Sequence, residues 1–318
     1  MFHRLSSFQR LALWTTAITY FLILVGGLVR ASGAGLGCPD WPRCFGGWIP
    51  PLSAADLPPQ FDASQFNPTL MWTEYLNRLL GMAVGFLILA TVVSAWRHHR
   101  REPRILWTAI AALLLTGFQG WLGGRVVAHE LAAWIVTIHM IVALVIVQML
   151  LYVTVVAQDK PKGLSPQQGL SPQPSGGDKP LRGDKPLGLS ISVLIVITLI
   201  QIALGTQVRG GVDAALDAGT ARADALATVG WLDYAHRDAA MAVLLGAVLL
   251  TAWLVSRHSP LVRWSYAVLT LAALQVAVGV VMAYGSLLLA AQVLHLTIAS
   301  LLLGAETVLF LLSWRQTT

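Results

Sequence analysis

The chain has 318 residues, of which 56% are hydrophobic and only 11% charged, and its mean hydropathy is +0.68. An ordinary soluble domain carries about 25% charged residues. The composition therefore excludes a soluble domain and predicts an integral membrane protein. The net charge of +6 is no sign of nucleic-acid binding, because the basic residues divide by membrane side.

Eight apolar runs are long enough to cross a bilayer core, which takes about 20 residues of helix. They cover residues 11–29, 72–96, 105–124, 132–156, 189–208, 231–255, 264–284 and 287–313. The runs are continuous and do not alternate, which favours helices over barrel strands. We therefore expect an all-α membrane protein. Most Lys and Arg residues fall in the segments that would share a side with the N-terminus, which predicts cytoplasmic N- and C-termini.

A cleaved signal peptide is the rival interpretation of residues 1–31. We discount it, because the apolar run is long for a signal peptide and has a counterpart later in the chain. The matched positions are Gly26, Val29 and Arg30 with Gly205, Val208 and Arg209; Trp72, Glu74, Tyr75, Asn77 and Arg78 with Trp231, Asp233, Tyr234, His236 and Arg237; and Gln119, Gly123 and His139 with Gln275, Gly279 and His295.

This repeat predicts two parallel four-helix bundles. Because each copy has four spans, both copies begin on the same side of the membrane. We expect the first bundle in residues 1–156, with a long outer loop at 30–71, and the second in residues 188–318. Residues 157–187 between them are rich in Pro, Gly, Ser and Lys, which predicts a disordered linker on the inner side.

Three of the eight histidines, His139, His236 and His295, lie inside apolar runs at matched repeat positions. The other five are His3, His98, His99, His129 and His258, and they lie among charges or in a short loop, where solvent exposure is the simpler explanation. Histidines on the second and fourth helices of a bundle can hold a heme from both faces. Zinc is the rival metal but lacks its usual ligand cluster, and a proton relay is the other alternative.

Each copy also carries a carboxylate four positions before an arginine, Glu74 with Arg78 and Asp233 with Arg237. This spacing places the two groups on one helix face. Glu74 near a heme edge can accept protons, and the arginines suit heme propionates. Ion pairs that only orient the helices are the alternative.

Cys38 and Cys44 lie six positions apart in the outer loop, close enough to pair on the oxidising side of the membrane. The pair is either a structural staple or a redox-active disulfide. Trp41 and Trp48 in the same loop either line an entry path for heme or pack the loop.

Together these features resemble the heme A synthase family, in its type with a single outer-loop cysteine pair. The resemblance rests on Gly26-Gly27-Leu28-Val29-Arg30, on Cys38-Pro39-Asp40-Trp41-Pro42 with Cys44, on Glu74-Tyr75 with Arg78, on Gln119-Gly120-Trp121-Leu122-Gly123, and on the histidines of the fourth, sixth and eighth runs. It covers nearly all of the chain except the linker.

The resemblance implies oxidation of the C8 methyl of heme O to a formyl group, which yields heme A for terminal cytochrome oxidases. It implies that His236 and His295 are axial ligands of a heme b cofactor, that the first bundle takes heme O, and that Glu74 is catalytic. It also implies that the cysteine pair receives heme or exchanges redox equivalents.

The implied location is the plasma membrane of a prokaryote. The implied partners are the lipid bilayer, heme O synthase, the terminal oxidase assembly machinery and an electron donor or acceptor that the sequence does not identify. Self-association stays open.

Asn77 stands where the family supplies a second histidine, and an amide is a poor iron ligand. Three consequences stay open. His139 holds the substrate heme iron alone, or Asn77 weakens turnover, or the chain is a heme b-binding electron carrier or sensor without synthase activity.

Overall fold

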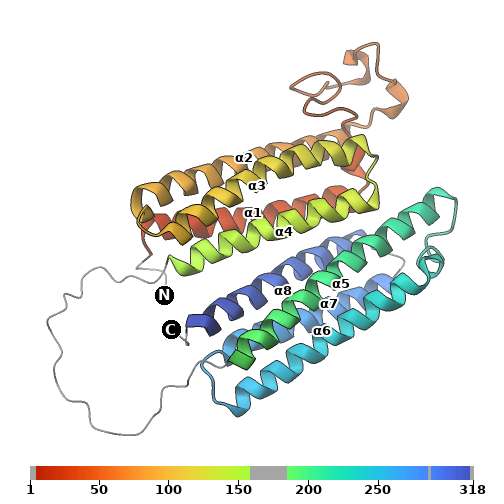
Figure 1. The fold of residues 1–318 in the computed structure, drawn as a ribbon. Helices are drawn as coiled ribbons and strands as arrows, with labels where there is room; N and C mark the ends of the chain where they lie inside the picture. The colour runs from red at the N-terminus through yellow and green to blue at the C-terminus, as the bar shows by residue number, and fades with distance from the viewer. Residues whose placement is uncertain (1–4, 158–184, 286–287, 316–318) are drawn as a thin grey trace, which may run out of the picture.

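The computed structural model describes residues 5–157, 185–285 and 288–315. Within these ranges eight helices are long and apolar enough to span a membrane, and there is no β-strand. They are α1 Ser7–Ala31, α2 Pro68–His99, α3 Pro103–Ala128, α4 Ala133–Val156, α5 Lys185–Asp217, α6 Trp231–Ser256, α7 Val262–Tyr284 and α8 Leu289–Arg315 (Figure 1). The predicted all-α membrane fold with eight spans is confirmed.

The helices form two bundles that lie side by side. In the first, α1, α2, α3 and α4 pack in sequence order and α4 closes against α1; α5 to α8 do the same in the second (Figure 1). The bundles meet where α8 packs on α1 and α4, and where α4 packs on α5. The first residues of α1 and the last residues of α8 lie at the same end of the bundles, as an even number of spans requires (Figure 1).

The two bundles bury their residues in the same register. In α2 the buried core residues include Val84, Ile88 and Ala95, and in α6 they are the matched Val243, Ala247 and Leu254. Positions 77 and 236 precede these by two helical turns on the same face. Asn77 and His236 therefore point into the interiors of their bundles, near the outer ends.

The largest departure from the predicted spans is at α5. Its apolar run ends at Val208, but the helix continues to Asp217, so Arg209 lies within the helix and not in an outer loop. Asp213 explains this, because it pairs with Arg209 at 2.9 Å and also with Arg30 of α1. A charged side chain near the end of a membrane-spanning helix costs less free energy when it is paired with an opposite charge. Of the predicted linker, residues 158–184 lie outside the described residues, and α5 already begins at Lys185.

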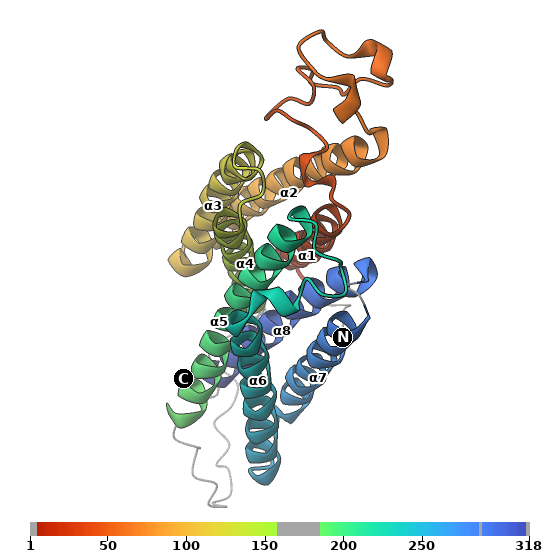
Figure 2. The same cartoon turned by 90° about the vertical axis from the view of Figure 1, so that its right-hand side faces the viewer.

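The outer loop runs between Ala31 and Pro68 and contains the short 3₁₀ turns η2 Ala34–Leu36, η3 Ala54–Asp56 and η4 Ala63–Gln65. It extends sideways from the outer end of α2, away from the second bundle (Figures 1 and 2). The loop has a small core of its own, in which Phe45 packs edge-on against Phe61 and Phe66. Cys38 and Cys44 are disulfide-bonded beside this core, which confirms the predicted pairing.

Candidate functional site

The second bundle brings His236 of α6 and His295 of α8 together. Their ring centroids are 6.2 Å apart. Two imidazoles bound to opposite sides of one metal ion have ring centres about 6 Å apart, because a metal–nitrogen bond of about 2 Å and about 1 Å to the ring centre add on each side. The spacing of His236 and His295 therefore fits the two axial ligands of one heme iron.

The His236 ring is held by α5. Its Nδ1 donates to the Gln201 carbonyl oxygen at 3.0 Å, which leaves Nε2 unprotonated. The Gln201 side-chain amide lies at a long 3.5 Å from Nε2, so a metal that binds there would displace it. His295 Nδ1 is buried beside the Gln275 backbone but makes no hydrogen bond of normal geometry. A buried polar atom without a partner costs free energy, so a bound group that engages the histidines fits this site.

Glycines at matched positions make room for these rings. A Cβ on Gly205 would lie 2.8 Å from His236 Cε1, and one on Gly279 would lie 3.2 Å from His295 Cε1. Both distances are shorter than ordinary van der Waals contact, so any larger residue would push the ring aside. In the first bundle, Gly123 also faces His139, but a Cβ there would lie 3.5 Å from His139 Cε1, which is ordinary contact.

The first bundle repeats this arrangement with an amide in place of one imidazole. Asn77 of α2 and His139 of α4 stand where the second bundle has His236 and His295. Asn77 Oδ1 and His139 Nδ1 are both buried without a hydrogen-bond partner. Two unpaired polar atoms at matched positions fit a bound group in this bundle as well, and His139 is the imidazole that its described residues offer to an iron.

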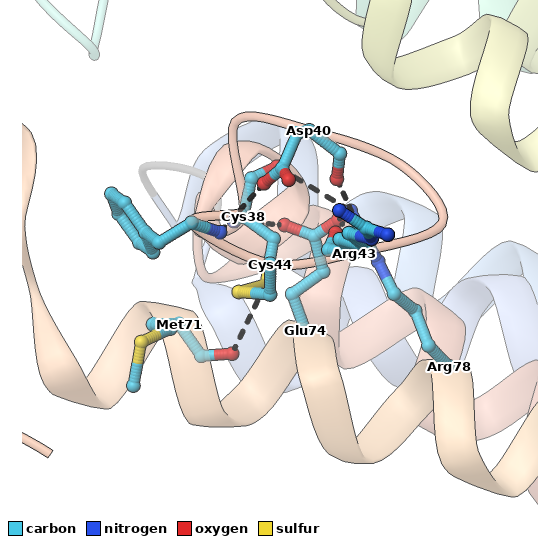
Figure 3. A network of polar contacts seen from close by, with 8 residues as sticks. Cys38, Asp40, Arg43, Cys44, Met71, Glu74 and Arg78 are labelled. Carbon is cyan, nitrogen blue, oxygen red and sulfur yellow. Dashed lines mark hydrogen bonds and ion pairs between the residues drawn. A yellow bond between two sulfur atoms is a disulfide. The ribbon is translucent and has the colours of Figure 1, made fainter. Parts of the chain in front are cut away.

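Glu74 lies one helical turn before Asn77 on α2 and is buried beneath the disulfide loop (Figure 3). Its Oε2 accepts a hydrogen bond from the Cys38 backbone N–H at 2.8 Å. Its Oε1 accepts from Arg78 Nε at 3.1 Å and also from Arg78 Nη2. Charge-assisted bonds of this kind hold a carboxylate firmly in one orientation. The disulfide loop and Arg78 therefore position Glu74 together.

Arg78 also ties the loop to α2. Its Nη1 donates to the carbonyls of Asp40 at 2.8 Å and Arg43 at 2.9 Å, and its Nη2 to that of Cys38 at 3.4 Å (Figure 3). A guanidinium has five N–H donors, and these contacts use them all. For Arg78 to bind a heme propionate, as the sequence predicts, some of the loop contacts would have to break.

The corresponding pair in the second bundle is more open. Arg237 binds Asp233 through two contacts, at 3.0 and 2.6 Å. The Arg237 side chain is 47% exposed, against 15% for Arg78. Of the two arginines, Arg237 is thus the more accessible.

The two loop tryptophans differ in their surroundings. Trp41 lies against α3, where a Cβ on Gly124 would come within 2.8 Å of the indole ring. Trp48 is 66% exposed and has the Arg43 guanidinium 5.6 Å from its ring centroid. Trp41 therefore packs the loop onto the bundle, whereas Trp48 does not.

Glu306, a fully buried carboxyl group within α8, was not among the residues predicted from the sequence. Its Oε1 accepts from the Thr198 hydroxyl at 2.9 Å, and its Oε2 has no partner. The sequence does contain a sign of this residue, because a carboxylate inside an apolar membrane span is costly and rare. Also overlooked was the junction at the outer ends of the two bundles, where Arg30, Asp213 and Arg209 form consecutive ion pairs.

Comparison with known proteins places these features in a family. A family model described as "Cytochrome oxidase assembly protein" matches residues 9–307. A heme A synthase of Allorhizobium ampelinum is 30% identical over 142 residues, 39% of this chain and 39% of that protein. The heme A synthase of Methylorubrum extorquens is 30% identical over 167 residues, 46% of this chain and 43% of that protein.

The chain thus spans about two fifths of the length of the curated relatives it matches. The family model, in contrast, extends over all eight described helices, except for the residues of α1 before position 9 and those of α8 after position 307. The chain belongs to the cytochrome oxidase assembly protein family.

Proposed function

We propose that this protein acts as a heme A synthase, oxidising the C8 methyl of heme O to a formyl group for use by a terminal cytochrome oxidase. The observation that carries the proposal is the contrast between the bundles. The second holds two imidazoles at the spacing of axial ligands, and the first pairs one imidazole with an amide and a buried carboxylate. The relatives in Allorhizobium ampelinum and Methylorubrum extorquens are named heme A synthases, which agrees with the proposal.

In this proposal the second bundle binds heme b through His236 and His295. Heme b, when bound, supplies one-electron transfer. The bond from His236 Nδ1 to the Gln201 carbonyl fixes the ring orientation, and Gly205 and Gly279 leave space beside the rings. Arg237, exposed at the outer end, is the residue we assign to a heme propionate.

The first bundle takes heme O as substrate. His139 binds one face of its iron, and Asn77, a poor ligand, leaves the other face open. Glu74 accepts protons released from the methyl group as it is oxidised, which requires a carboxylate in a fixed position. Cys38 N–H and Arg78 supply that position by binding both Glu74 oxygens.

The same proposal places the protein in the plasma membrane of a prokaryote, with both termini in the cytoplasm. Heme O synthase and the oxidase assembly machinery would be its partners. Water would supply the formyl oxygen, and an electron carrier would accept the electrons released by the oxidation. The cysteine pair would exchange redox equivalents or receive heme on the outer side.

Pigment extraction tests the proposal. The chain is expressed in cells that make heme O, purified, and its hemes are extracted and identified by chromatography and mass. We expect heme b together with heme O, a hydroxylated intermediate or heme A. Heme b alone, from cells that contain heme O, would instead support an electron carrier or sensor, which Asn77 favours. Asn77→His, measured in parallel, tells whether the asparagine limits turnover.

A further inference from the structure

The outer loop carries an apolar segment with three large side chains that it does not bury. Residues Trp48, Ile49, Pro50, Pro51 and Leu52, here named the apolar tip, contain no charged side chain. Ile49 is 75% exposed and Leu52 76%, and Trp48 is exposed as well, whereas Pro50 between them is buried against the loop. Large apolar side chains that are held out from a protein next to one another mark a contact with something other than water.

The loop sits above the lipid-facing side of α2. Met71, Tyr75 and Arg78 contact the loop. With the same spacing of three and four residues, the helix continues with the exposed side chains of Met82, Phe86, Leu89, Val93 and Trp96. Residues at this spacing share one helix face. Among the described residues no helix packs on that face of α2, which leaves it open to lipid on the side over which the loop lies.

The two views of the fold agree with this placement. The loop lies beyond α2, on the side away from the second bundle, at the level of the outer helix ends (Figures 1 and 2). It does not lie over the centre of either bundle. Membrane-spanning helices end near the boundary between headgroups and acyl chains, and tryptophan is enriched at that boundary in membrane proteins.

The apolar tip is held in place by α2. The Tyr75 hydroxyl donates to the Trp48 carbonyl at 2.8 Å, and Arg78 binds the carbonyl of Arg43 nearby. The charged residues of the loop lie outside the tip, where Asp40 accepts from two loop amides and Asp56 accepts from Ser53. The tip itself therefore presents only apolar side chains to its surroundings.

We propose that the apolar tip is embedded in the outer leaflet beside α2, so that the loop is a second attachment of the first bundle to the membrane. The partner is the lipid surface itself, with Trp48, Ile49 and Leu52 in contact with acyl chains. Arg43, stacked on Trp48, lies at the level of the phosphates. This inference does not depend on the proposed enzyme activity.

Spin labelling of the full chain in phosphatidylcholine vesicles tests the proposal. Leu52→Cys introduces a label site in the tip, and Ala63→Cys is the matched control, an exposed residue on the same loop outside the tip. The native cysteines do not interfere, because they are buried in the disulfide. We expect the label at position 52 to be relaxed by oxygen and to lose relaxation by a water-soluble nickel chelate, and the label at position 63 to show the reverse.

Equal relaxation by the chelate at both positions would place the tip in water and overturn the proposal. Shielding of position 52 from both agents would mean that protein covers the tip, which also overturns it. Vesicles containing brominated lipid give an independent measurement. Trp48→Phe should remove a quenchable part of the tryptophan emission, and an unchanged quenched fraction would count against lipid contact.

Discussion

The glycine beside His236 provides a sharp test of the heme b site. In Gly205→Ala the new Cβ would lie 2.8 Å from His236 Cε1, and ordinary contact begins at 3.4 Å, so the ring must retreat by about 0.6 Å. The ring is already fixed by its bond to the Gln201 carbonyl and by its 6.2 Å spacing to His295. After that movement the ring cannot keep both the hydrogen bond to Gln201 and the spacing to His295. Disturbing the support of a metal ligand typically weakens binding about 10- to 100-fold.

The measurement is the absorption spectrum of the purified variant, together with its ratio of heme b to protein. We expect loss of the six-coordinate bis-imidazole spectrum and a lower heme content. A weaker helix would not explain such a loss, because alanine favours a helix by about 1 kcal/mol over glycine.

Gly26→Ala is the matched control in the first bundle. Its Cβ would lie 4.0 Å from Asn77 Oδ1, which is ordinary contact, so heme b should be unaffected. If Gly205→Ala kept the full spectrum, the argument that this glycine makes room for a ligand histidine would be refuted. If both variants lost heme equally, the cause would be general disruption of the bundles.

Three further predictions follow from the contacts described. Glu74→Gln should keep heme b and stop heme A formation, since the amide cannot accept the protons; loss of both pigments would contradict the separate roles of the bundles. Asp213→Asn should lower the free energy of unfolding by about 2 kcal/mol in a thermal or denaturant assay, because Arg30 and Arg209 lose a shared charged partner; unchanged stability would mean that the junction adds nothing. Glu306→Leu installs the residue type of the matched position in the first copy and removes an unpaired buried oxygen, so stability should be equal or higher by about 1 kcal/mol; a loss would show that the carboxyl group is needed for folding.

The spans, the repeat and the inward-facing histidines were predictable from the sequence. Each depends on a constraint that acts locally along the chain, since a bilayer demands long apolar helices and a helix sets its faces by a spacing of three and four residues. The repeat added to this, because a second copy with the same register showed which positions share a role. His139, His236 and His295 were singled out in this way, and the structure places each near the outer end of its bundle, matched as predicted.

The surroundings of Glu74 could not be predicted in the same way. Its partner Cys38 N–H comes from a loop with no periodic pattern, and the use of every Arg78 donor depends on where three loop carbonyls lie in space. The pairing of Arg30 with Asp213 joins residues of different bundles, for which no spacing rule exists.

By itself, then, the sequence determined the membrane class, the number of spans and the residue types that face each bundle interior, because hydrophobicity and helix geometry are properties of neighbouring residues. The tertiary structure alone decided which groups hold Glu74, how the two bundles are joined and where the outer loop lies. Those outcomes depend on contacts between residues far apart in the chain, and a linear pattern carries no record of such distances.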